Sequence, residues 1–226
     1  MPNWCSNTIV VSGNDLTKFR EFLGDGEGFL SKIAPTPQPL VDTVSGWSGN
    51  PEEQKKVEEQ QAANLLQYGF KDWYDWNIGT WGTKWDVNAE IDDGSSIDTQ
   101  IIFSFESAWA PPQKAISLLA QKFPELSFRH SFLEEGMGFV GVDEYEQGGV
   151  SNQDYSEDSD SEEWKCIATE EFNWQPWQDD VVESEPVVEV TKPVEKPAKK
   201  KVKKAVKKVK KPTKKLAKKK KKAKKK

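Results

Sequence analysis

Three carboxylates in the middle of the chain, Asp86, Glu90 and Glu106, have a spacing that could support chemistry. Residues 84–91 and 101–105 alternate between polar and apolar side chains, a pattern that predicts two neighbouring β-strands. The three carboxylates then share one face of the sheet, where they could hold a divalent metal ion or act as an acid–base pair. The alternative is an acidic strand face in contact with solvent. We favour this alternative, because no spacing singles out a catalytic residue, and we expect no bound metal and no cofactor.

Charge is distributed very unevenly along the chain. Residues 192–226 contain 21 lysines and one glutamate, whereas residues 1–191 contain 11 basic and 36 acidic residues. Such a concentration of like charge favours contact with nucleic acid or another polyanion over a merely solubilising charge run. The segment has no arginine and no aromatic residue, so we expect contacts with phosphates and little sequence preference. The candidate phosphate-binding residues are Lys199, Lys200, Lys201, Lys203, Lys204, Lys207, Lys208, Lys210, Lys211, Lys214, Lys215, Lys218, Lys219 and Lys220.

The remaining residue types with chemical potential point to structural roles. His130 is in phase with Phe128 and Phe132, which predicts a core position rather than a base or a metal ligand. Cys5 and Cys166 lie far apart and without Cys-x-x-Cys spacing, so neither a disulfide framework nor a zinc site is indicated. No apolar run is long enough to span a bilayer, and the N-terminus does not have the layout of a signal peptide. We therefore expect a cytoplasmic protein without membrane association.

The elements that would position these residues centre on a cluster of tryptophans. Residues 73–86 contain four of the ten tryptophans and lead into the alternating pattern that begins at Lys84. We interpret this cluster as the centre of one folded domain. Trp85 is expected to be buried, in the same strand phase as Val87 and Ala89.

The order of the predicted elements indicates an α+β fold. A strand over residues 4–12 is followed by a helix that ends at Gly24, and a helical insertion follows. In that insertion a helix begins at Pro51, with Val57, Ala62, Leu65 and Leu66 as its expected buried stripe. Two strands, a helix after Pro111-Pro112 and a further strand at residues 126–132 follow, and a turn at residues 135–138 then leads the chain into residues 139–145. This is the ferredoxin-like split βαβ plan, with a four-stranded antiparallel sheet and helices on one face.

The composition predicts three segments. Residues 1–150 hold nearly all the periodic apolar stripes and are expected to form the ferredoxin-like domain. Residues 151–191 are expected to be an acidic, partly disordered linker, with residues 151–163 disordered and an edge strand at residues 164–168. The linker carries an aromatic island, Phe172 to Trp177, which we expect to dock on the domain. Residues 192–226 are expected to form a disordered, lysine-rich tail.

Four short motifs carry a resemblance to a known family. They are Pro2-Asn3-Trp4-Cys5-Ser6-Asn7, Trp81-Gly82-Thr83-Lys84-Trp85-Asp86, Ala108-Trp109-Ala110-Pro111-Pro112 and Glu135-Gly136-Met137-Gly138-Phe139-Val140-Gly141. In their order they resemble the YubB-like ferredoxin-fold domain of phages and plasmids over residues 1–150, although Ala110 stands where the family has serine. The lysine-rich tail is similar to a linker-histone C-terminal tail in composition alone.

The resemblance implies a fold and a mobile-element setting, but no established activity, so it supplies no catalytic residues. The motif residues are expected to be structural or partner-binding. They are Trp4, Trp81, Gly82, Lys84, Trp85, Asp86, Trp109, Pro111, Pro112 and Gly136.

Two functional hypotheses from different classes follow. The favoured one is a non-enzymatic phage or mobile-element accessory protein, whose acidic domain binds a protein partner while the lysine-rich tail binds nucleic acid without sequence specificity. The alternative is a small enzyme with a carboxylate site near the tryptophan cluster. A virion-associated structural protein, packaged with the genome, is a third possibility.

Overall fold

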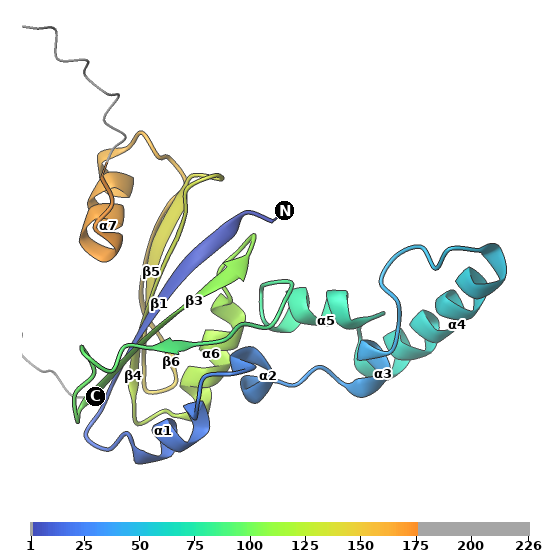
Figure 1. Cartoon of the computed structure of the whole chain (residues 1–226), viewed down its shortest axis with the longest axis horizontal. Coiled ribbons are helices and arrows are strands. Elements are labelled where there is room, and N and C mark those ends of the chain that lie inside the picture. Colours follow the sequence, from blue (N-terminus) through green and yellow to red (C-terminus); the bar gives the residue numbers. More distant parts are fainter. Residues whose placement is uncertain (1, 176–226) are drawn as a thin grey trace, which may run out of the picture. The chain divides into compact units, whose positions relative to one another are not determined.

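The computed structural model describes residues 2–175, and Figure 1 shows how their helices and strands are arranged. In chain order the elements are β1 (Trp4–Ser12), α1 (Thr17–Leu23), α2 (Phe29–Ile33), α3 (Gln38–Val41), α4 (Pro51–Tyr68), α5 (Trp73–Thr80), β2 (Glu90–Ile91), β3 (Gln100–Ala108), α6 (Gln113–Lys122), β4 (Ser127–Glu134), β5 (Phe139–Glu146), β6 (Gly149–Ser156) and α7 (Glu162–Phe172).

The strands form one antiparallel sheet in the order β2-β3-β1-β4-β5-β6. The part β2-β3-β1-β4, with α1 and α6 as its connecting helices, has the strand order of the split βαβ plan. The ferredoxin-like architecture predicted from the sequence is therefore present. The sheet has six strands instead of the expected four, because β5 and β6 continue it as two successive hairpins.

One face of the sheet carries the main core. Strand residues that alternate inward from β1, β3 and β4 meet α1, α2 and α6, which cover this face (Figure 1). Phe19 of α1 lies at the centre, with its ring within 6.3 Å of the rings of Phe103, Phe123 and Phe128. Offset and edge-on packing of this kind adds to the stabilisation that the buried apolar area gives.

The second face is partly covered by α7, which corrects the expectation that helices occupy only one face. Trp164 and Ala168 of α7 pack on Leu133 of β4 and Val140 of β5, and all four side chains are buried. Ser161 caps this helix, since its hydroxyl accepts the Trp164 backbone N–H. Among the described residues, no helix covers the half of this face formed by β1 and β3.

The chain beyond residue 150 also differs from the expected linker. Residues 151–156 belong to β6, and the expected edge strand at residues 164–168 is helical. The polar residues of β6, Asp154 among them, are tolerated because their side chains lie at a solvent-exposed sheet edge, where only backbone pairing is needed. Phe172 and Trp174 pack against the α7 cluster, as expected for the aromatic island. Residues 176 and 177 of that island and the tail at residues 192–226 lie outside the described residues.

The long insertion helix α4 begins as predicted, but the prediction of its buried residues is wrong. Asn50 caps the helix by accepting the Glu53 backbone N–H. Leu65 and Leu66 are 49% and 91% exposed, and Asn64 is the buried residue of α4. Its amide donates to the Thr43 hydroxyl and to the Lys71 carbonyl oxygen, so a polar contact fixes this helix where apolar packing was expected.

The tryptophan cluster is helical in its first half. Asp72 caps α5 by accepting the backbone N–H groups of Tyr74 and Asp75. The expected strand over residues 85–91 is reduced to β2, because residues 87 and 89 exchange backbone hydrogen bonds with the loop at residues 26–29 instead of a strand. Trp85 consequently lies outside the sheet and is 39% exposed, which corrects its expected burial.

Candidate functional site

The four motifs, far apart in the sequence, meet at one end of the sheet. The Thr83 hydroxyl donates to the Ala108 carbonyl oxygen (2.8 Å), and the Trp109 backbone N–H donates to the Asn3 carbonyl oxygen (2.9 Å). A Cβ atom on Gly136 would lie only 2.9 Å from the Asn3 amide nitrogen, so the last motif reaches the first one as well. We call this region the motif end of the sheet.

Backbone conformation explains two of the motif residues. Gly82 has a φ of +94°, which favours glycine, and a Cβ atom there would crowd the carbonyl oxygen of Pro111 at 3.3 Å. Trp109 has a φ of +70°, which is uncommon for a residue with a side chain, and directly precedes Ala110-Pro111-Pro112. Residues that are held in such sparsely populated backbone conformations concentrate at functional positions.

The motif end presents exposed aromatic side chains. The rings of Trp4 and Trp85 lie 6.1 Å apart, and these residues are 51% and 39% exposed. The Lys84 ammonium lies 4.7 Å from the Trp85 ring centroid and 5.7 Å from that of Tyr74, within the range of cation–π contacts. We call these four residues the aromatic surface. Trp81, by contrast, is buried and donates its indole N–H to the Ala34 carbonyl oxygen, so its role is structural.

The three carboxylates predicted to share a face do line one groove, of about 410 Å³, beside Trp4 and Phe172. Asp86 is already committed there, since its carboxylate accepts the backbone N–H groups of Leu30, Ser31 and Val87. Glu106 accepts the Ser6 hydroxyl at 2.9 Å. Within residues 2–175, no group of three or more His, Cys, Asp or Glu side chains is placed to hold a metal ion. Because two of the N–H groups that it accepts, those of Leu30 and Ser31, lie in the first turn of α2, Asp86 acts as a cap of that helix.

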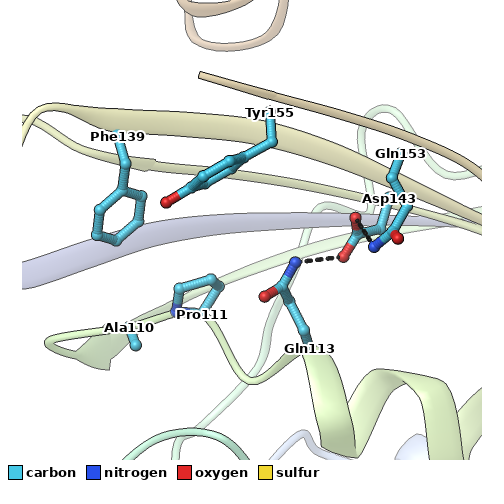
Figure 2. A pocket seen from close by; sticks show the side chains of 7 residues that line it. All are labelled: Ala110, Pro111, Gln113, Phe139, Asp143, Gln153 and Tyr155. Carbon is cyan, nitrogen blue, oxygen red and sulfur yellow. Dashed lines mark hydrogen bonds between the residues drawn. The ribbon is translucent and has the colours of Figure 1, made fainter. Parts of the chain in front are cut away.

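A second cavity, of about 400 Å³, lies where β5 and β6 meet the start of α6 (Figure 2). Its walls are Phe139 and Tyr155 on the strands and Ala110 and Pro111 on the motif before α6. At its inner end lies Asp143, a carboxylate that is only 2% exposed. The polar lining of this pocket is Gln113, Asp143 and Gln153.

Sequence reasoning missed this pocket. Asp143 stands in the same strand phase as Phe139 and Tyr145, where an apolar residue is expected, and that mismatch was the available signal. Gln113 and Gln153 carry no such signal, because polar residues at a helix start and on an edge strand are ordinary.

The single histidine belongs to a buried polar network, as its strand phase predicted. His130 Nε2 lies 2.9 Å from Asn7 Oδ1, while the Asn7 amide donates to the Cys5 carbonyl oxygen and to the Ser107 hydroxyl. Complete burial lowers the pKa of His130 from 6.5 to about 3. Burial raises the pKa of the Cys5 thiol to about 12. Neither side chain is therefore prepared for acid–base or nucleophilic chemistry at neutral pH.

A comparison with family models agrees with this architecture. Residues 80–174 match the family model described as the ferredoxin-like domain in Api92-like protein. This match confirms the predicted fold class and covers β2 through α7. It therefore includes α7 and most of β6, which the sequence pattern had assigned to a linker after the domain.

The chain is also similar to a solved structure, the protein Api92 from Yersinia pseudotuberculosis. The two share 12% identity, with a TM-score of 0.42, over 68% of this chain and 97% of that chain. No curated protein matches the chain. None of the helices in the described part combines the length and apolar character that a membrane crossing needs. The candidate lysines, from Lys199 to Lys220, lie outside the described residues.

Proposed function

We propose that this protein is a non-enzymatic accessory protein of a phage or another mobile element. Its folded part binds a protein partner at the motif end, and its lysine-rich C-terminal segment binds nucleic acid without sequence preference. The observation that carries the proposal is the aromatic surface, where Trp4 and Trp85 are half exposed on a rigidly held part of the fold.

The aromatic surface supports partner binding because exposed tryptophans are rarely placed together without use. Tryptophan, tyrosine and arginine dominate the binding energy of protein interfaces, since large rigid rings bury much area at a low entropy cost. Hydrogen bonds between the motifs hold the backbone next to these rings. A surface that is ordered before binding loses less conformational entropy when a partner docks.

The uneven distribution of charge supports separate binding roles for the folded part and the lysine-rich segment. Residues 192–226 carry 21 of the 32 basic residues, and residues 1–191 are strongly acidic. The groove beside Trp4 is lined by Glu90 and Glu106, which would repel phosphate and attract a basic segment of a protein. The lysine-rich segment is therefore the part suited to nucleic acid, and the folded part is suited to a protein.

The enzyme alternative receives no support from the carboxylates. Asp86 accepts three backbone N–H groups, which a catalytic or metal-binding carboxylate would have to release. Packaging in the virion stays a prediction that detection of the protein in purified particles would test.

Nucleic-acid binding is tested by comparing the full chain with a 1–190 truncation, which keeps every described residue. The full chain should bind short duplex DNA of any sequence. If 6–10 lysines meet phosphates, the affinity should fall about 10³- to 10⁵-fold between 50 and 200 mM salt. The truncation should not bind. Salt-insensitive binding that the truncation retains would assign nucleic-acid binding to the folded part and overturn this half of the proposal.

Partner binding is tested by affinity purification from host cells with three versions of the full chain. Trp85→Ala changes the aromatic surface, and Leu66→Ala is the matched control, an exposed apolar residue on α4. A partner should be recovered with the wild type and with Leu66→Ala and be lost with Trp85→Ala. Recovery of the same proteins with all three would remove the aromatic surface from the proposal.

A further inference from the structure

The pocket between β5, β6 and the start of α6 has the shape of a slot. Figure 2 shows the rings of Phe139 and Tyr155 on one side and the ring of Pro111 on the other, with Gln113 and Asp143 at the inner end. Tyr155 is 48% exposed, so one wall of the slot is open to solvent. A flat group can enter between the tyrosine ring and the proline ring and reach the polar end.

Asp143 places a negative charge at the inner end of the slot. Its Oδ2 accepts the Gln113 amide at 2.7 Å, and its Oδ1 accepts the Gln153 amide at 2.9 Å. The Tyr145 hydroxyl is a third neutral donor, 3.3 Å from Oδ2. Asp143 takes part in none of the salt bridges among residues 2–175. A buried carboxylate with neutral partners alone is costly, and a cation that enters the pocket would offset part of that cost.

The same carboxylate fixes the direction of a glutamine amide. A carboxylate can only accept hydrogen bonds, so Gln113 must turn its N–H toward Asp143 and its carbonyl oxygen away from it. In Figure 2 this oxygen lies on the side of Pro111, facing the slot. The Tyr155 hydroxyl is engaged as a donor to Glu157 at 2.9 Å. The slot thus offers acceptors and negative charge to its ligand, together with an aromatic face.

We propose that this pocket binds the guanidinium group of an arginine side chain that a protein partner supplies. A guanidinium is planar and cationic, carries five N–H donors and stacks on aromatic rings, which matches the slot, the acceptors and Tyr155. A nucleobase is also flat, but the phosphates attached to it would meet the acidic charge of residues 1–191. This inference rests on the proposed function in one respect, that a protein partner exists.

The chain itself cannot supply this group without losing other contacts. It contains two arginines: Arg20 donates to the Ile97 carbonyl oxygen, and Arg129 pairs with Glu144 and Glu171. The C-terminal segment has lysines only, and a compact, strongly hydrated ammonium fits a flat slot less well than a guanidinium does. Discrimination between arginine and lysine is consequently the signature of the pocket.

The test is calorimetric titration of the full-length protein with N-acetyl-L-argininamide and, separately, with N-acetyl-L-lysinamide. The arginine probe should bind at least about tenfold more tightly, a difference of about 1.4 kcal/mol. Asp143→Asn keeps the size of the side chain and removes its charge, and it should weaken the arginine probe by a similar factor. Tyr155→Leu, at a half-exposed position, should also weaken it. Glu59→Gln, an exposed carboxylate on α4 away from both cavities, is the matched control and should change nothing.

Equal binding of the two probes, or unchanged arginine binding in Tyr155→Leu and in a folded Asp143→Asn protein, would overturn the assignment. A Gly-Gly-Arg-Gly-Gly peptide distinguishes the sources of the group: a partner's arginine requires that this peptide bind as well as the free probe, and its exclusion would contradict a protein ligand. If a partner lost with Trp85→Ala is still recovered with Asp143→Asn, the pocket inference fails while the proposed function stands.

Discussion

The hydroxyl of Thr83 donates a hydrogen bond of 2.8 Å to the carbonyl oxygen of Ala108, and both residues are buried. This contact joins the segment after α5 to the end of β3, and thereby fixes the residues that follow each of them, Lys84-Trp85 and Trp109. The threonine side chain satisfies a strand-end carbonyl and thereby connects the two motifs. It also gives the motif end a single bond that can be tested.

Replacing Thr83 with valine should destabilise the protein by about 1–3 kcal/mol, because the Ala108 carbonyl oxygen would remain buried without its donor. Thr83→Ser keeps the hydroxyl and should retain most of the stability. Urea unfolding of the two variants measures the difference. If valine were as stable as serine, the hydrogen bond would contribute nothing net and the motifs would be held together by packing.

Trp81 and Trp85 provide a matched pair with opposite exposure. Trp81 is 2% exposed and hydrogen-bonded, so Trp81→Ala should cost about 3–5 kcal/mol, as large-to-small core substitutions do. Trp85 is 39% exposed, so Trp85→Ala should cost far less, about 1 kcal/mol, and should act on partner binding instead. Chemical denaturation of both variants checks this order, and equal losses would contradict the assigned exposures.

His130 should make stability depend on pH in a defined direction. Since the Asn7 amide donates elsewhere, its Oδ1 must accept from His130 Nε2–H. Complete burial keeps the imidazole neutral in the folded protein at neutral pH. The unfolded chain binds a proton below about pH 6.5, whereas burial holds the folded pKa near 3. The contribution is therefore complete above pH 6.5 and is lost as the pH falls toward 3, by up to about 1.4 kcal/mol per pH unit.

The check is the unfolding free energy of the wild type and of His130→Gln between pH 7 and 4. Other titrating groups cancel in the difference between the two proteins, so the advantage of the wild type should shrink as the pH falls. A difference that does not vary with pH would mean that His130 titrates normally.

Periodicity predicted the parts of the fold in which side chains alternate against a core. β1, β3 and β4 follow the alternation of Ile9, Phe103 and Phe128, and these strands carry the ferredoxin-like order. Periodicity failed where backbone or polar contacts decide the outcome. Residues 85–89 read as a strand but bond to a loop, and α4 is fixed through Asn64 while Leu66 is exposed.

The candidate site was predictable in composition but not in geometry. The motifs identified Trp4, Trp85 and Trp109, whereas their convergence depends on strand register that no local pattern contains. Likewise, the sequence pattern predicts that Asp86 is a surface carboxylate. Two of its backbone partners, Leu30 and Ser31, lie about 56 residues away in the sequence, and the third, Val87, directly follows it.

Limited trypsin digestion tests the packing of α7. Lys165 is the last basic residue before Lys192, so cleavage after it reports whether the helix is released. In the wild type, the lysine-rich tail should be removed first, and cleavage after Lys165 should be slow. Trp164→Ala empties the centre of the α7 cluster and should accelerate that cleavage, whereas Cys166→Ala, at an exposed position, should not. Rapid cleavage after Lys165 in the wild type would contradict the packed helix.

The acidic residues just before the lysine-rich segment should weaken its binding to DNA. Five of them lie within residues 176–190, a stretch without any basic residue: Asp179, Asp180, Glu183, Glu185 and Glu189. Tethered so near, carboxylates compete with phosphate at a high effective concentration. Residues 149–172 cannot be deleted in such a test, because they form β6 and α7. Changing the five acids to amides should therefore tighten duplex binding several-fold at low salt, and less as screening increases.

The control changes the exposed glutamates of α4 to glutamine, which alters the net charge at a place that is not next to the lysine-rich segment in the sequence. Equal tightening in both variants would show that total charge, and not local competition, limits binding.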